Sequence, residues 1–120
     1  MNYKTFTRTG DIYCLFYEMG NRLLKPGYFL GFITSNKWMR ANYGVATRKY
    51  FIDHTNPLLL VDFGGYQVFD SATVDTNILI FQHSSYSGKT QTCLFDKSLG
   101  SLEKMSDLIR QYSSFNTRFL

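Results

Sequence analysis

Basic and aromatic side chains are concentrated in one short stretch of the 120-residue sequence. Residues 34–51, TSNKWMRANYGVATRKYF, contain four bases and no acid. The bases are Lys37, Arg40, Arg48 and Lys49, and Trp38 and Tyr43 are interleaved with them. Lysine and arginine bind phosphates and release condensed counterions, while amide and hydroxyl groups fix the position of a backbone. The stretch is equally compatible with a nucleic-acid contact and with the solvated face of an ordinary helix.

Three aspartates lie in or beside a long loop that follows an apolar segment. Asp62 comes just before the twelve-residue loop GGYQVFDSATVD, and Asp70 and Asp75 lie within it. Aspartates at such positions more often stabilise turns and caps than act as acids and bases. Gly64 and Gly65 indicate only a tight turn, since the sequence contains neither GxxxxGK[ST] nor GxGxxG. The loop is longer than most connections in compact domains, which favours a functional role.

Cysteine and histidine residues form no recognisable metal-binding pattern. The candidates Cys14, His54, His83 and Cys93 are not at the paired spacing of a zinc site. Cys14 could act as a nucleophile with either histidine, but it falls within a helical pattern, which favours a structural role. Two distant cysteines are also too few for a disulfide framework. We therefore expect free, buried thiols and a reducing, cytoplasmic environment.

The composition is that of a soluble folded domain. Hydrophobic residues make up 44% and aromatic residues 18% of the sequence, which excludes a disordered chain. The net charge of +4 permits a polyanionic partner without requiring one. No basic start is followed by an apolar run, and no stretch approaches about 18 consecutive apolar residues, so we expect no signal peptide and no membrane span.

Apolar periodicity predicts a mixed sheet covered by helices. Residues 11–24 are predicted to form an amphipathic helix with Asp11 as its N-cap. Its apolar positions are Ile12, Leu15, Phe16, Met19 and Leu23. Residues 27–34 have the pattern of a strand buried on both faces. The other predicted elements are a helix over 43–53, strands over 58–63 and 76–81, a turn over 84–89, an edge strand over 90–95 and a last helix carrying Leu102, Met105, Leu108, Ile109 and Tyr112.

Two stretches of the sequence, taken together, resemble a known family. They are GDIYCLFYEMGNRLLKPGYFLGFITSNKWMRANYG and NPLLLVDFGGYQVFDSATVDTNILIF. They resemble the catalytic domain of the adenine-specific DNA methyltransferases of restriction–modification systems, particularly the large type II enzymes that fuse methylase and nuclease. The resemblance spans about residues 5–82. It implies a partial Rossmann-like α/β fold of the S-adenosylmethionine-dependent methyltransferases, in which an adenine is flipped out of the duplex for methylation. The strand over 76–81 would be antiparallel.

The sequence departs from that family in two motifs. The glycine-containing cofactor motif is missing, and so is the catalytic motif with adjacent prolines, because the only prolines are Pro26 and Pro57. The resemblance therefore implies that residues 1–82 are the distal half of a methyltransferase domain, and that 83–120 lead towards a target-recognition region. We expect no catalysis and no S-adenosylmethionine binding by this chain alone. The implied partners are the upstream half and duplex DNA, and an exposed sheet edge could cause self-association.

The resemblance also implies roles for particular residues. The loop after the strand over 27–34 leaves the carboxyl end of that strand, the edge where open α/β sheets bind ligands. Ser35, Asn36, Lys37 and Trp38 would line a DNA-facing rim there, with Arg40 contacting phosphate. In the long loop, Phe69 matches the aromatic that stacks on the extruded adenine, with Tyr66 as a rival. Asp75 and Thr76 would support the loop without an assigned chemical role.

Two other interpretations remain open at this stage. A free-standing DNA- or partner-binding module would be a monomer with a protected sheet edge, whereas a methyltransferase segment would expose an apolar edge. A small structural protein with a chance resemblance would have no affinity for DNA and no salt dependence. Packing beneath the loop is the alternative role of both Phe69 and Tyr66.

Overall fold

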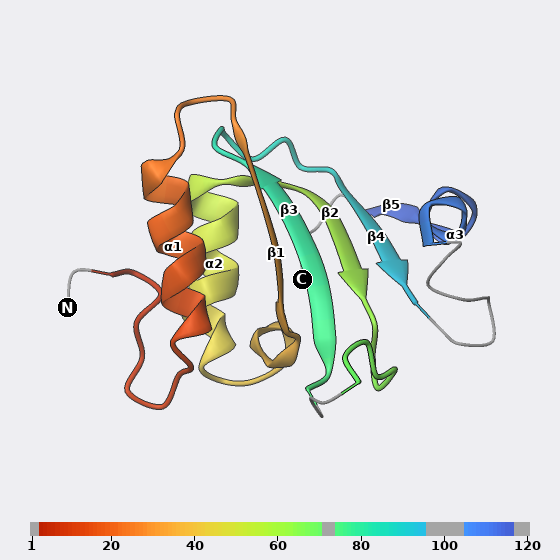
Figure 1. Ribbon diagram of the computed structural model, residues 1–120. Helices are drawn as coiled ribbons and strands as arrows, with labels where there is room; N and C mark the ends of the chain where they lie inside the picture. The colour runs from red at the N-terminus through yellow and green to blue at the C-terminus, as the bar shows by residue number, and fades with distance from the viewer. Residues whose placement is uncertain (1–2, 71–73, 96–104, 117–120) are drawn as a thin grey trace.

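The computed structural model describes residues 3–70, 74–95 and 105–116, which form a five-stranded sheet with helices on both faces (Figure 1). In chain order the elements are α1 (Tyr13–Leu23), β1 (Phe29–Ser35), the 3-10 helix η1 (Lys37–Met39), α2 (Gly44–His54), β2 (Asn56–Asp62), β3 (Thr76–Gln82), β4 (Thr90–Leu94), α3 (Met105–Tyr112) and β5 (Ser114–Asn116). The predicted helices over 11–24 and 43–53 and the first three predicted strands are confirmed to within about two residues. Leu102 of the predicted last helix lies outside the described residues.

The sheet is mixed, as expected, with the strand order β1-β3-β2-β4-β5. Both β1 and β2 pair antiparallel with β3, so they are parallel to each other, and β4 pairs parallel with β2. The antiparallel direction expected for the strand over 76–81 is therefore confirmed. The expectation that 90–95 form an edge strand is wrong, because β5 pairs with the outer side of β4. Only three residues long, β5 is too short to produce a periodic signal.

An aromatic core fills the space between the sheet and the layer of α1 and α2. Its centre is Tyr17, Trp38 and Phe51, all with exposed fractions of 0%. The ring centroid of Phe51 lies 5.1 Å from those of both Tyr17 and Trp38 in edge-on arrangements. Such geometry stabilises aromatic pairs by about 0.5–1.5 kcal/mol beyond the area they bury. This cluster fixes η1, which carries Trp38, against both helices.

A second, smaller core lies on the opposite face of the sheet beneath α3. It contains Val61, Phe63, Cys93, Phe95 and Leu108.

Both cysteines, Cys14 and Cys93, are buried and free, as expected. Burial raises the pKa of the Cys14 thiol, which keeps it protonated and unsuited to nucleophilic attack.

The apolar stripe of α1 points away from the core, although the apolar face of an amphipathic helix usually packs against the core. The residues that α1 buries are Cys14, Tyr17, Glu18 and Asn21. The stripe residues Ile12, Phe16, Met19 and Leu23 are exposed, Leu23 to 79%. Asp11 is not the N-cap, because α1 begins after Ile12 and has no side-chain cap. Periodicity identified the helix but not which of its faces would be covered.

The prediction that residues 27–34 are buried on both faces is also wrong. Leu30 and Phe32 pack towards α1 and α2, but Phe29 and Ile33 are exposed to 59% and 43%. β1 lies at the edge of the described sheet, and the α3 core lies under β2 and β4 rather than under β1. An uninterrupted apolar run shows only that both faces of a strand are suited to burial. Within the described residues, nothing packs over the face of β1 that carries Phe29 and Ile33.

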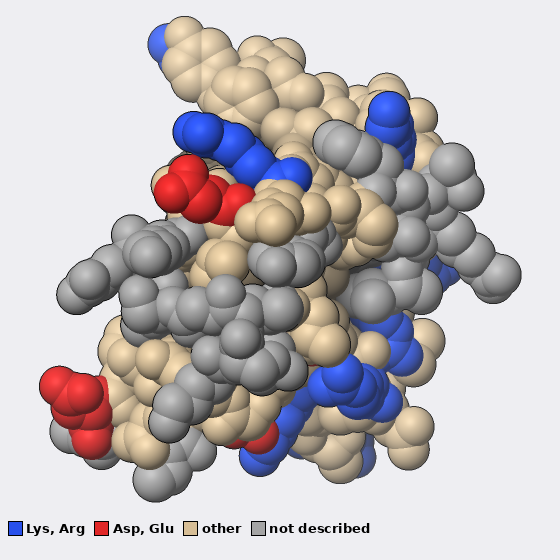
Figure 2. Space-filling model, turned by 90° about the vertical axis from the view of Figure 1, so that its right-hand side faces the viewer, with Lys and Arg blue, Asp and Glu red and all other residues tan. Residues whose placement is uncertain are grey.

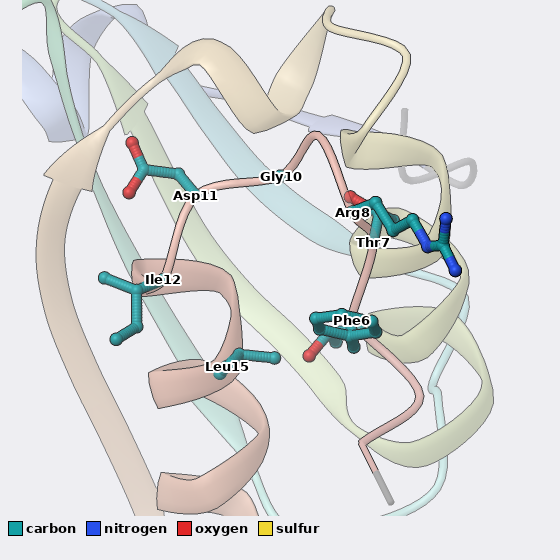
Figure 3. A pocket seen from close by; sticks show the side chains of 8 residues that line it. Phe6, Thr7, Arg8, Gly10, Asp11, Ile12 and Leu15 are labelled. Atoms are coloured by element: carbon teal, nitrogen blue, oxygen red, sulfur yellow. The ribbon is translucent and has the colours of Figure 1, made fainter. Parts of the chain in front are cut away.

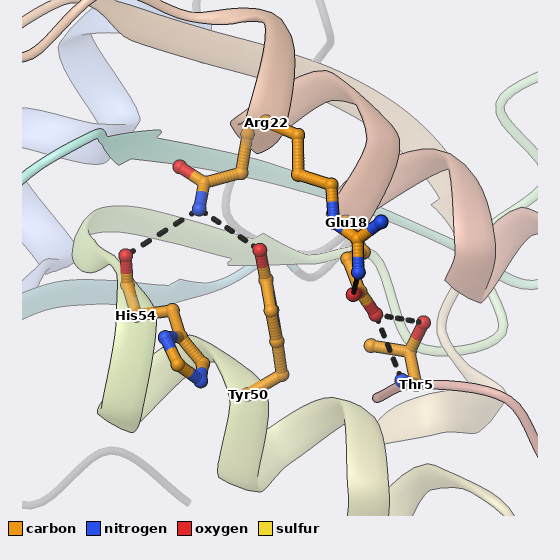
Figure 4. Close-up of polar contacts among 6 residues, drawn as sticks. Thr5, Glu18, Arg22, Tyr50 and His54 are labelled. Carbon is orange, nitrogen blue, oxygen red and sulfur yellow. Dashed lines mark hydrogen bonds and ion pairs between the residues drawn. The ribbon is translucent and has the colours of Figure 1, made fainter. Parts of the chain in front are cut away.

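Glu18 ties the segment before α1 to the helix. Its carboxylate has no exposed surface and accepts hydrogen bonds from the backbone N–H and the hydroxyl of Thr5, at 2.9 and 3.0 Å, and from Arg22 (Figure 4). Nearby, the Asn21 amide donates to the Tyr50 hydroxyl at 2.9 Å and joins α1 to α2. Burial acts to raise the pKa of Glu18, but the bonds from Thr5 and the charge of Arg22 outweigh it and lower the pKa.

We expect Glu18→Gln to reduce the free energy of unfolding at neutral pH by about 2 kcal/mol, because it weakens a buried, charge-assisted network. Since the folded pKa is depressed, the carboxylate stabilises the protein above the pKa of the unfolded glutamate. This stabilisation is lost as the pH falls through the lower folded pKa. Urea denaturation at neutral and acidic pH measures both effects. The exposed Asp107–Arg110 pair supplies the control, since Asp107→Asn should cost less than about 0.5 kcal/mol. Equal pH profiles for wild type and E18Q would contradict the assignment.

Candidate nucleic-acid interface

The loops that follow β1 and β2 leave the sheet at the same edge. Because these two strands are parallel, their carboxyl ends lie together, with the start of the antiparallel β3 between them (Figure 1). In open α/β sheets this is the edge where ligands bind. We call it the strand-exit edge; it comprises residues 35–40, 62–70 and 74–76.

A hydrogen-bonded network joins the three segments of the strand-exit edge. The Asn36 side-chain amide donates to Asp62 Oδ1 at 3.0 Å, and the Gly64 N–H donates to the same oxygen at 2.9 Å. The Asn36 backbone N–H donates to the carbonyl of Asp75 at 2.9 Å. Gly64 adopts a φ of +55°, which glycine accommodates without the strain that a side chain would add. The two exit loops are therefore held in a fixed relation to each other.

The first loop places only part of its predicted rim at the surface. Lys37 and Arg40 are exposed, and Ser35 is half-buried with its hydroxyl accepting from the Lys37 N–H at 3.2 Å. The placement of Trp38 on the rim is wrong, because its indole is completely buried in the aromatic core. Asn36 is also buried, and its amide faces Asp62. Both residues support the rim from beneath.

The remaining bases of the 34–51 stretch have contacts within the protein. Arg48 donates to the backbone carbonyls of Trp38 and Ala41, at 2.7 and 3.2 Å, and so closes the loop between η1 and α2. Lys49 forms an exposed ion pair with Asp53 one turn further along α2. Tyr13 accepts from the Trp38 backbone N–H at 3.1 Å, and burial raises the pKa of its hydroxyl, which therefore stays protonated. The basic residues that face outwards at the strand-exit edge are Lys37 and Arg40.

The second loop separates the two candidate stacking residues. Tyr66 is half-buried and packs edge-on against Phe95, with 5.0 Å between the ring centroids. Phe69 is 42% exposed, and the Gln67 side chain donates to its carbonyl at 3.0 Å. Tyr66 thus has the packing role that was the alternative for both residues, whereas the ring of Phe69 is accessible.

Asp75 and Thr76 contribute to the strand-exit edge through their backbones. The Thr76 carbonyl accepts from the Phe63 N–H at 3.0 Å, as the Asp75 carbonyl does from Asn36. Thr76 is buried and Asp75 is exposed.

Asp62 is the residue whose place in the network the sequence analysis did not anticipate, because an aspartate beside a loop is more often a turn residue. Its position at the end of a strand parallel to β1 was the available signal.

Two hollows lie near the strand-exit edge and the start of α1. One, of about 480 Å³, is lined by Asp11, Ser35, Lys37, Val74 and Asp75. The other, of about 200 Å³, lies between residues 5–10 and the first turn of α1 (Figure 3). In the second hollow the side chains of Arg8 and Asp11 point away from each other, so its charged groups do not converge on a ligand.

The described residues do not fit an S-adenosylmethionine site. Gly64 and Gly65 follow β2 but lead into a loop rather than into a helix whose N-terminus could hold the cofactor. The larger hollow is lined by two carboxylates, a lysine, a serine and a valine, without an aromatic wall. Residues 3–70, 74–95 and 105–116 also contain no group of three metal-binding side chains, and no helix among them is long and apolar enough to cross a membrane.

The surface on the β4, β5 and α3 side carries its charges unevenly. Figure 2 shows Lys and Arg side chains gathered in the lower right of this view, with one acidic group beside them and other acidic groups at the left. A local excess of positive charge attracts a polyanion, although the net charge of +4 is modest.

Solved methyltransferases share this fold. The structure resembles the M protein of the type I restriction enzyme EcoKI, with a TM-score of 0.65 and 13% identity over 92% of this chain and 28% of that one. It resembles the type IIG restriction endonuclease BpuSI with a TM-score of 0.68 and 12% identity, covering 94% of this chain and 15% of that one. The structure also resembles a class I S-adenosylmethionine-dependent methyltransferase from Listeria monocytogenes, with a TM-score of 0.66 and 18% identity, covering 91% of this chain and 35% of that one. The fold is therefore a partial Rossmann-like methyltransferase fold.

Sequence comparison narrows this class to a family. The model of the Eco57I restriction-modification methylase family matches residues 1–69, more than half of the chain. The chain therefore belongs to that family. It is 29% identical over 84 residues to the type II restriction enzyme and methyltransferase RM.Eco57I of Escherichia coli. The match covers 70% of this chain and 8% of RM.Eco57I, so the chain corresponds to a small part of that relative.

Proposed function

We propose that the chain is the distal half of a site-specific DNA adenine methyltransferase of a restriction–modification system, with its strand-exit edge facing duplex DNA. The observation that carries this proposal is the arrangement of exposed Lys37, Arg40 and Phe69 on two loops joined by the buried hydrogen bond between Asn36 and Asp62. A family resemblance alone would not require these side chains to be accessible and close to one edge. The proposed setting is the cytoplasm.

In this proposal each exposed group has a distinct role. Lys37 and Arg40 contact phosphates, which position the DNA without reading its sequence. Phe69 stacks on the adenine that is extruded from the duplex. Sequence readout requires side chains inserted into the major groove, and we assign that task to a target-recognition region beyond the sheet, towards which residues 83–120 lead.

The cofactor and the catalytic groups come from the upstream half of the domain in this proposal. The family chemistry needs adjacent prolines that hold acceptors against the target amine, but Pro26 lies in the turn between α1 and β1 and Pro57 lies in β2. The poor fit of the glycines after β2 and of the larger hollow to the cofactor supports this assignment. We therefore expect S-adenosylmethionine to bind the assembled enzyme and this chain alone to be inactive.

The handedness of the fold supports a docking site for the upstream half at the edge of β1. α1 and α2 lie side by side on the same face of the sheet (Figure 1). α2 carries the chain from β1 across to β2. Crossovers between parallel strands are right-handed in about 98% of cases, so successive crossover helices on one face of a sheet normally carry the chain across it in the same direction. We therefore expect the strand that leads into α1 to lie on the other side of β1, at its open edge.

The outward stripe of α1 supports the same docking site. Ile12, Phe16, Met19 and Leu23 project from the helix on the side opposite its buried face. Gly20 packs against Leu30 of β1, so the helix lies against that edge strand. A further helix covering the added strand would bury the stripe. Without it, the exposed stripe and the unpaired edge should make the isolated chain self-associate.

The test is transfer of labelled methyl groups from S-adenosylmethionine to adenine-containing duplex DNA. The chain is assayed alone and together with the upstream half expressed as a separate polypeptide. The proposal expects no transfer by the chain alone and transfer by the mixture. Activity of the chain alone would overturn the assignment of catalysis to the upstream half. Silence of both, with DNA binding retained, would instead favour a free-standing binding module.

We expect Leu23→Glu to prevent assembly with the upstream half while leaving the stability of the chain nearly unchanged. Leu23 is 79% exposed, so it contributes little to folding, but a carboxylate would be buried unpaired in the proposed interface. Leu94→Glu is the matched control, since Leu94 is 63% exposed on β4, away from α1. Co-purification and methyl transfer measure assembly. Equal assembly by L23E, L94E and wild type would rule out the stripe as the docking surface.

A further inference from the structure

The carboxylate of Asp62 connects the two loops that the proposed function places against DNA. We propose that Asp62 is a positioning residue, which holds the Arg40 guanidinium in the orientation in which it meets a phosphate. This inference rests on the proposed function and deepens it. Asp62 acts through Arg40 and does not touch DNA itself.

The fold fixes one oxygen of the carboxylate and leaves the other directed at Arg40. Oδ1 accepts from the Asn36 amide at 3.0 Å and from the Gly64 N–H at 2.9 Å, and the residue is only 7% exposed. Oδ2 lies 3.4 Å from Nη2 of Arg40, whose side chain is 72% exposed. The pair therefore combines an immobile acid with a mobile base. The acid determines where the base points.

Orientation is what such a pair can supply. An ion pair of this length with a largely exposed arginine adds little to folding stability. A long arginine side chain, however, loses considerable rotamer freedom when it is fixed against a ligand, and prior restraint reduces that loss. The guanidinium has five N–H donors in a planar fork, so one edge can face Asp62 while other donors remain available for a phosphate.

Positioning and simple electrostatics make opposite predictions for removal of the Asp62 charge. A carboxylate close to DNA repels phosphates, so neutralising it should tighten binding if charge alone matters. If Asp62 positions Arg40, neutralising it should weaken binding although the protein becomes more basic. The sign of the change decides between the two.

The experiment compares Asp62→Asn with Asp53→Asn in the chain assembled with its upstream half. Asp53 carries the same charge and pairs with Lys49 near the carboxyl end of α2, so D53N matches the change in charge away from the strand-exit edge. Dissociation constants for a mixed-sequence duplex are measured by fluorescence anisotropy over a range of salt concentrations. Thermal unfolding of each variant monitors the fold.

We expect D62N to bind about five- to tenfold more weakly, and its plot of log affinity against log salt to become shallower by about one, the value of a lost phosphate contact. R40A should show the same change in slope, and the double variant should be no worse than R40A. D53N should bind as tightly as wild type or slightly more tightly. D62N binding at least as tightly as wild type would overturn the inference.

A second variant keeps the inference testable if D62N does not fold. Arg40→Lys preserves the charge at an exposed position but lacks the planar fork that can meet a carboxylate and a phosphate together. Weaker binding and a shallower slope for R40K support positioning, and wild-type binding by R40K overturns it. Failure of the assembled wild type to bind duplex DNA would overturn the proposed function and this inference together.

Discussion

Phe69→Ala is expected to weaken binding of the assembled enzyme to the duplex that it methylates by about 1–3 kcal/mol, roughly five- to 150-fold, because stacking on a base contributes that much. The exposed ring of Phe69 does not belong to either core, so its removal should leave the free energy of unfolding nearly unchanged. Titration of the labelled duplex measures the affinity. Phe69→Trp, which retains a stacking surface, should recover most of it.

Tyr66→Phe provides the control for this experiment, because it keeps the ring that packs on Phe95 and removes only the hydroxyl. We expect Y66F to bind the duplex like wild type. Wild-type affinity of F69A would show that Phe69 is not the stacking residue, and a loss confined to Y66F would indicate instead that the Tyr66 hydroxyl contacts the duplex.

Gly44→Ala is expected to have the largest effect on stability. A Cβ atom at Gly44 would overlap the backbone carbonyl of Trp38, at 1.9 Å from its oxygen and 2.6 Å from its carbon. Backbone cannot yield as a flexible side chain can, so η1 and α2 must separate. Because η1 carries Trp38, their separation would disturb the aromatic core, and we expect a loss of about 3 kcal/mol or more in the free energy of unfolding.

Gly65→Ala is the matched control for that substitution. A Cβ atom at Gly65 meets nothing within 4 Å, and its backbone does not adopt a positive φ. The substitution should change the free energy of unfolding by less than about 0.5 kcal/mol. Urea denaturation compares the two variants. Similar stabilities of G44A and G65A would mean that η1 can move away from α2 without cost to the core.

The order and type of most elements could be predicted from local patterns. The runs over 58–63 and 76–81 became β2 and β3 because apolar strands with turn residues at both ends have few alternatives. The direction of β3 came from the family resemblance, since no periodicity distinguishes an antiparallel strand from a parallel one. Coverage could not be predicted. The patterns of β1 and α1 suit burial, but which surfaces are covered depends on neighbours that local sequence does not specify.

The candidate site shows the same division. Its place at the carboxyl ends of parallel strands could be predicted, because topology alone determines it. The roles of individual residues could not. Trp38 stands between the exposed Lys37 and the half-buried Met39, and only packing against Phe51 reveals that it belongs to the core. Arg48 and Arg40 are chemically identical in the sequence, yet one binds backbone carbonyls and the other reaches the surface.

The position of β3 between β1 and β2 also governs how this sheet can assemble during synthesis. Phe29 pairs with Gln82, and Ser35 with Thr76, so even the shortest connection between β1 and its partner β3 closes a loop of forty residues, 36–75. β1 and β2 share no ladder with each other. The entropy of closing a loop of that size is lost before strand pairing contributes any stabilisation, so folding depends on non-local contacts. In a nascent chain that has been synthesised only as far as β2, β1 and β2 have no strand between them with which to pair. Once β3 has been synthesised, it can pair with both strands and complete the central part of the sheet in one cooperative step.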